Sequence, residues 1–138
     1  MTSMFARMKR GLQSLAMGLL LTACAGGNDS PPDGAALFAR HCSSCHGQRG
    51  EGDGPVAAVM QVTVPNLRSL SERSGGRFPR DAVVAYIDGR DLPAAHGDRY
   101  MPVWGNVFQW SATESADSEQ VVNERIAAIT DFLEQIQN

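Results

Sequence analysis

The residues best suited to chemistry in this chain form the run Cys42-Ser43-Ser44-Cys45-His46. Two thiols three positions apart at the end of a helix can reach the two vinyl groups of one porphyrin and form thioether bonds. The histidine that follows can then project an imidazole nitrogen onto the iron. The run therefore predicts one covalently attached haem c, with Cys42 and Cys45 as attachment points and His46 as an iron ligand.

Two other uses of a cysteine pair compete with haem attachment. A thioredoxin-like CxxC belongs after a strand in a βαβ unit, and the sequence contains no strand pattern of useful length. A structural zinc site needs four ligands, and the chain has no second cysteine pair, because its remaining cysteine is the isolated Cys24. Haem attachment is the interpretation that the spacing favours.

An iron with one axial histidine has a second face, which a side chain can bind or leave open. The candidates downstream are Met60, His96 and Met101. Met101 is well separated from His46 and precedes Pro102, which fixes the backbone. Met60 lies in an apolar stretch, where a core methionine is the default, and a surface position suits His96. We expect Met101 to bind the iron, with ligation by His96 or an open site as the alternatives.

Helical patterns surround these residues. We expect a first helix over 34–42 with Asp33 as its N-cap, a short one over 55–61, and another over 80–88 that ends at Gly89. Residues 47–54 carry four glycines and should form a loop, and residues 90–118 should form a long functional loop. The last helix shows the clearest apolar stripe, at steps of about 3.5 residues: Val122, Ile126, Ile129, Leu133 and Ile136.

The start of the chain has the pattern of a secretory signal. Positive charges at Arg7, Lys9 and Arg10 precede an apolar stretch that is shorter than the roughly 20 residues needed to span a bilayer. We therefore expect residues 1–23 to be a signal peptide. The protein would then work on the periplasmic side of a bacterial cell envelope.

The end of that segment, Leu21-Thr22-Ala23-Cys24, resembles the processing box of bacterial lipoproteins. The resemblance implies that Cys24 is lipidated and becomes the first mature residue. Ordinary cleavage after Ala25 is the alternative. Residues 24–33 are rich in Gly and Pro and should form a flexible linker, which leaves residues 34–138 as the single domain.

The charge of the chain argues against nucleic acid as a partner. Removing residues 1–23 takes away three positive charges and no negative charge, so the formal net charge would move from −3 to −6. The removed Lys9 is the only lysine. An acidic domain without lysine is poorly suited to binding phosphate backbones.

The region from Gly34 to the end resembles a class I cytochrome c. Gly34 and Phe38 stand eight and four residues before the first haem cysteine, as in that family, where they meet an aromatic residue of the last helix, here Phe132. The resemblance implies a small all-α fold of three to five helices around one haem. It also implies that the carbonyl of Pro65 accepts the ring N–H of His46.

The methionine loop supports the same resemblance. Met101-Pro102 followed by an aromatic residue is similar to the family's distal loop, and we expect Trp104 to form part of the haem-pocket wall. The chain lacks the ring of lysines with which mitochondrial-type cytochromes dock, so their partners cannot be transferred to it.

These features predict an electron-transfer protein and not an enzyme. His/Met ligation fills both axial positions of the iron and favours outer-sphere transfer of single electrons between respiratory redox proteins. We expect a monomer that is held at a membrane by its lipid anchor. The alternatives are a haem-bearing subunit of a larger oxidoreductase, or a peroxide- or gas-reactive haem protein if Met101 does not bind the iron.

Overall fold

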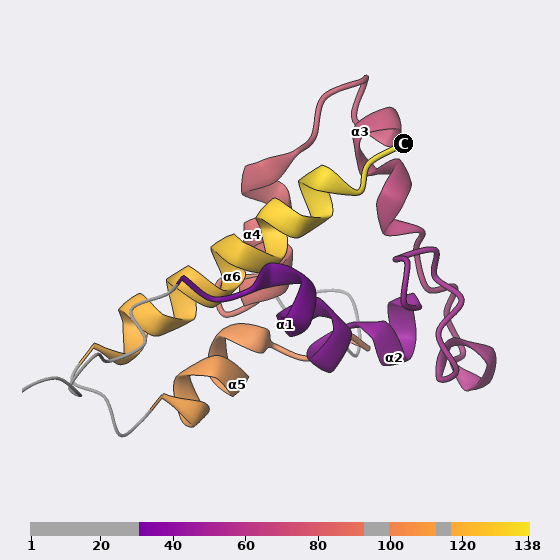
Figure 1. The fold of residues 1–138 in the computed structure, drawn as a ribbon. Helices are drawn as coiled ribbons and strands as arrows, with labels where there is room; N and C mark the ends of the chain where they lie inside the picture. Colours follow the sequence, from indigo (N-terminus) through magenta and orange to yellow (C-terminus); the bar gives the residue numbers. More distant parts are fainter. Residues whose placement is uncertain (1–30, 93–99, 113–116) are drawn as a thin grey trace, which may run out of the picture.

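The structure is a computed structural model that describes residues 31–92, 100–112 and 117–138. Within these ranges the chain forms six α-helices and two 3-10 helices, and none of these residues is in a strand (Figure 1). The predicted all-α class is confirmed, although the α-helices outnumber the expected three to five. The proposed signal peptide, Cys24, most of the linker and His96 lie outside the described residues.

Helix α1 spans Gly34–His41 and begins where the sequence predicts. The Asp33 carboxylate accepts hydrogen bonds from the backbone N–H groups of Ala35 (2.9 Å) and Ala36 (3.2 Å). This N-cap satisfies two of the donors that a helix start leaves without partners. Because α1 leads directly into Cys42, the cap also fixes where the cysteine run begins.

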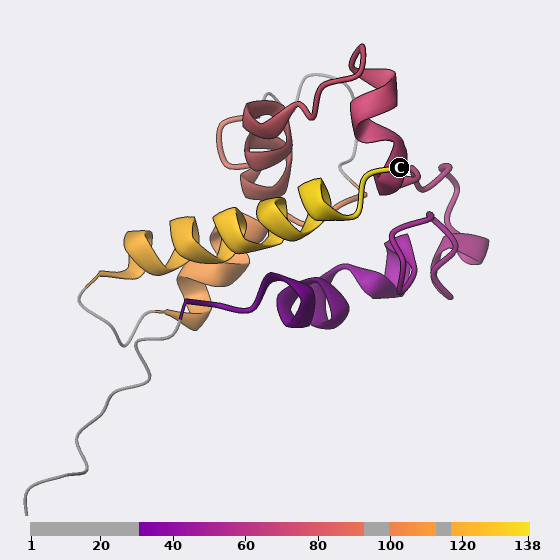
Figure 2. The ribbon, with the colours of Figure 1, turned by 45° about the horizontal axis from the view of Figure 1, so that its top comes forward.

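Helix α6, Ser118–Gln135, runs through the middle of the molecule and packs against α1, α4 and α5. In Figure 2 α4 lies above it and α1 below it. The predicted apolar stripe is confirmed, because its first four members are at most 3% exposed. They form one core cluster with Phe38, Val83, Ile87 and Phe108.

Helix α4 spans Arg80–Asp88 and ends at Gly89, whose φ of +71° is the left-handed conformation of a C-terminal glycine. Both bounds agree with the prediction. The helix expected over 55–61 is only the 3-10 helix η1, Ala57–Val59. Two further short elements, η2 (Leu67–Ser69) and α3 (Leu70–Arg73), were not predicted.

The prediction of an unbroken loop over 90–118 was wrong, because helix α5 occupies Trp104–Ser111. Its buried residues are Gly105 and Phe108, and it packs against α4 and α6. Its eight residues are too few for a clear period, and the exposed Val107 and Trp110 obscure the apolar face. Tertiary packing, more than local pattern, therefore stabilises this helix.

The last residues tie α6 to the middle of the chain. The Gln137 amide donates to the carbonyl of Leu67 (2.9 Å) and accepts from the backbone N–H of Ser71 (2.9 Å). The C-terminus consequently lies beside α3 (Figure 1). Of the described helices, none has the length and apolar character needed to cross a membrane.

Candidate haem site

The cysteine run forms one helical turn at the end of α1. Cys42 ends α1 and precedes helix α2, Ser43–His46. Its carbonyl accepts from the backbone N–H groups of both Cys45 (3.2 Å) and His46 (2.9 Å). Side chains three and four positions apart in a helical turn share a face, so the two thiols and the imidazole are presented together.

Both cysteines are free thiols, and the surroundings of Cys42 suit a neutral sulfur. Burial, and secondarily the neighbouring Cys45, raise the pKa of the Cys42 thiol to about 12. The unreacted Cys42 is therefore protonated at neutral pH. A thioether sulfur carries no charge, so the same half-buried position would hold it without an electrostatic penalty.

The ring of His46 is oriented by a backbone carbonyl. Its Nδ1 lies 3.3 Å from the carbonyl oxygen of Pro65, the contact that the resemblance implied. Since a carbonyl can only accept, Nδ1 carries the proton and Nε2 keeps a free lone pair for a metal. Burial lowers the pKa of His46, against the opposing effect of this hydrogen bond. The neutral imidazole that a metal requires is thus the form present at pH 7.

The predicted glycine loop holds Pro65 in place. The backbone N–H of Gly52 donates to the carbonyl of His46 (2.8 Å), with φ at +82°. A Cβ on Gly52 would lie 2.5 Å from the carbonyl oxygen of Val64 and 3.2 Å from that of Pro65. Only glycine lets the loop approach this closely. Gly52 was missed in the sequence, where the four glycines signal a loop but not the one that meets Pro65.

The residues after the long loop return to the start of the cysteine run. Trp104, the first residue of α5, lies with its ring centroid 5.3 Å from that of His41, directly before Cys42. Phe108 meets His41 at the same distance and stacks on Trp104 at 5.7 Å. These three rings form an aromatic wall. The part played by His41 was not predicted, and the place of Trp104 beside a haem stays a prediction.

Met101 precedes Trp104, the first residue of α5, by three positions. Met101, Trp104 and Cys42 are all partly buried and pack against the same core cluster. Residues far apart in sequence thereby pack against one hydrophobic core. Met60, the candidate given a core position, is half-buried in the C-cap of η1 and is not part of that cluster.

A comparison with protein families identifies the family to which the chain belongs. The profile of the family described as Cytochrome c matches residues 32–137. This chain belongs to the cytochrome c family. No significant match was found among curated proteins or among solved structures.

Cytochromes c carry a covalently attached haem c and use it for electron transfer. The residues of this cytochrome fit that group: Cys42 and Cys45 are free and adjacent on one turn, and His46 is neutral with its Nε2 available. The bound haem supplies an iron that alternates between Fe(II) and Fe(III).

Proposed function

We propose that this cytochrome is a single-haem carrier of one electron at a time, with His46 and Met101 as the axial ligands of its iron. The observation that carries the proposal is the hydrogen bond from His46 Nδ1 to Pro65, which leaves Nε2 free. The packing of Met101 and Cys42 against the same hydrophobic core cluster supports its part. With both axial positions filled, the iron exchanges electrons without binding a substrate.

The side chains around the site would set the direction of transfer. A thioether ligand is soft and favours Fe(II), which raises the reduction potential. The rings of His41, Trp104 and Phe108 pack together where α5 meets α1; by shielding a haem on that side from water, they would act in the same direction. The carrier would accept electrons from a respiratory donor and release them to an acceptor of higher potential.

Docking would occur beside the haem-attachment turn. Helix η1 packs against α2, and the backbone N–H of Val56 donates to the carbonyl of Ser44 (3.0 Å). Val56 and Val59 are 40% and 81% exposed, so apolar side chains border this turn. Transient redox complexes use small interfaces, below about 1,200 Å². A partner with an apolar surface at its own cofactor edge would fit here.

The same proposal places the cytochrome outside the cytoplasm, at the envelope membrane. It rests on the signal-like residues 1–23 and the lipoprotein-like box that ends at Cys24. A tether of about ten residues would keep the domain near its membrane partners and raise their effective concentration. Radiolabelled palmitate should label the expressed protein but not Cys24→Ala; labelling of neither protein would refute the anchor.

The test of carrier against reactive haem protein is a potentiometric titration of the holoprotein beside a peroxide assay. The proposal predicts one reversible one-electron transition and no enzymatic consumption of hydrogen peroxide. A high-spin ferric spectrum with peroxide turnover would contradict it and favour the reactive haem protein. Co-purification of a fixed partner in mild detergent would instead favour a subunit of a larger oxidoreductase.

A further inference from the structure

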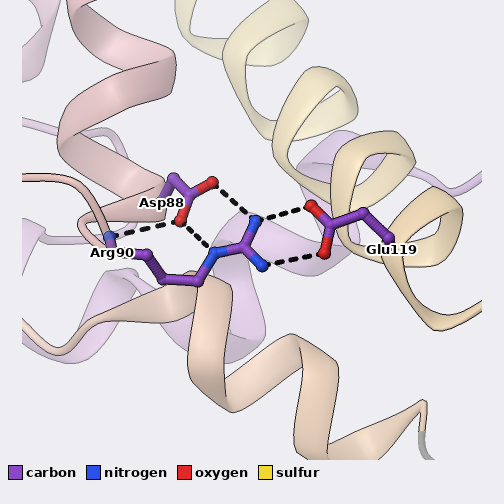
Figure 3. Close-up of polar contacts among 3 residues, drawn as sticks. All are labelled: Asp88, Arg90 and Glu119. Carbon is purple, nitrogen blue, oxygen red and sulfur yellow. Dashed lines mark hydrogen bonds and ion pairs between the residues drawn. The ribbon is translucent and has the colours of Figure 1, made fainter.

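Arg90 lies between two carboxylates that come from different helices (Figure 3). Its Nε and Nη2 donate to the two oxygens of Asp88 at the end of α4, at 2.6 and 2.9 Å. Its Nη1 and Nη2 donate to the two oxygens of Glu119 in the first turn of α6, both at 2.8 Å. Bidentate pairs of this kind are the strongest and most directional that arginine makes.

A third helix closes against the same cluster. A Cβ on Gly105, in the first turn of α5, would overlap Asp88 Oδ1 and would lie 2.5 Å from Arg90 Nε. The Asp88 carboxylate therefore sits at the N-terminal end of α5, where a negative charge is favoured by the helix dipole. Val103, the N-cap of α5, supplies no side-chain hydrogen bond of its own.

The cluster of Asp88, Arg90 and Glu119 lies at the base, or stem, of the loop that carries Met101. The segment 91–103 begins directly after Arg90 and ends directly before α5, so its two ends are held at one point. Met101 lies only four residues before Gly105. Binding of Met101 to the iron is an intramolecular event, and its effective concentration falls as the connecting chain becomes longer or looser.

We propose that Arg90 is a positioning residue for Met101: by joining Asp88 to Glu119 against Gly105, it closes the stem of the loop and holds the methionine near the iron. The inference rests on the proposed ligation by His46 and Met101. The structure gives the guanidinium of Arg90 two protein carboxylates as partners.

If Arg90 only linked α4 to α6, replacing another arginine that links these helices should have the same effect on Met101. The chain contains such an arginine as a matched control. Arg80, the first residue of α4, likewise binds two carboxylates, here both of α6: Asp131 (2.5 Å) and Glu134 (2.7 Å). Its side chain is away from the ends of segment 91–103. Arg80→Gln removes the same charge and hydrogen bonds from Nη2 to two carboxylates without loosening the stem.

The experiment titrates the oxidised holoprotein with imidazole, which binds only where Met101 has left the iron. The apparent affinity of such a ligand is proportional to the population of the competent state. Arg90→Gln should raise that affinity by about fivefold to tenfold, the effect of one charge-assisted network. It should also weaken the charge-transfer band between methionine and ferric iron. Arg80→Gln should change neither.

A milder variant keeps the test open if Arg90→Gln does not fold. Glu119 is 56% exposed, so Glu119→Gln removes one arm of the cluster at the surface; it should raise the imidazole affinity in the same direction by a smaller factor. Equal imidazole affinities in Arg90→Gln and Arg80→Gln, or an unchanged affinity in Glu119→Gln, would overturn the inference about Arg90 but not the proposed iron ligation. Absence of the charge-transfer band from the parent protein would overturn the proposed ligation and the inference with it.

Discussion

The properties of His46, the proposed iron ligand, depend on backbone contacts that converge on it. The carbonyl of Pro65 accepts the ring N–H of His46. Gly52 has no side chain that could push this carbonyl away. A hydrogen-bonded imidazole is a stronger donor to iron and favours the ferric state. The distance between His46 and Pro65 should therefore help to set the reduction potential.

Gly52→Ala tests this contact. The new Cβ would displace the Val64–Pro65 peptide and lengthen the hydrogen bond to His46. Loss of a bond worth about 1 kcal/mol corresponds to an upward shift of about 40 mV in a one-electron potential. The control is Gly75→Ala, because Gly75 has a similar φ (+74°) but nothing within 4 Å of its Cβ. Equal potentials in the two variants would contradict the assignment.

At the scale of elements, the crossing of α1 and α6 fixes where the cysteine run lies. A Cβ on Gly34 would overlap the backbone carbonyl of Ala128, so the two helices touch through their main chains. One turn later the rings of Phe38 and Phe132 meet at 5.1 Å. Since α1 leads into Cys42, this crossing places the haem-attachment turn relative to the core.

Gly34→Ala should therefore destabilise the protein although alanine is the better helix former. Moving the two backbones apart would cost about 1–3 kcal/mol, the usual penalty of overpacking, against a propensity gain of below about 1 kcal/mol. The free energy of unfolding in guanidinium chloride measures this. Ala36→Gln, on the exposed face of α1, should leave the free energy of unfolding nearly unchanged. Similar free energies of unfolding for both variants would show that the crossing of α1 and α6 does not require a glycine at position 34.

How far the sequence determines these elements differs between them. Helices α1, α4 and α6 could be predicted because each has a cap or an apolar period in its own residues, such as Asp33 at the start of α1 and Gly89 at the end of α4. Helix α5 could not, because it is short and is stabilised by packing against α4 and α6. The proposed haem-attachment run is a local pattern of consecutive residues, whereas the Arg90 cluster joins three elements and has no local pattern.

At the scale of the whole molecule, the attachment turn and helix η1 lie at one end, away from α4 (Figures 1 and 2). The exposed Val56 and Val59 belong to this end. Electron transfer between two copies of the protein would use this face on both partners, because the proposed haem-attachment residues lie there. Repulsive charges on the face should slow that exchange.

Val59→Glu tests the docking face without a natural partner. The electron self-exchange rate between oxidised and reduced copies, measured by NMR line broadening, should fall severalfold at low ionic strength and recover as salt screens the added charge. The potential should not change. Ala82→Glu adds the same charge to the exposed surface of α4 as a control. A drop of equal size in both variants would place docking elsewhere.

The central claim, a haem iron held between His46 and Met101, is tested most directly by the visible and near-infrared spectrum of the oxidised holoprotein beside Met101→Ala, Met60→Ala and His96→Ala. We predict a charge-transfer band between methionine and ferric iron that disappears in Met101→Ala and persists in the other two variants. Loss of the band in Met60→Ala instead, or a parent spectrum of the high-spin or bis-histidine type, would contradict the claim.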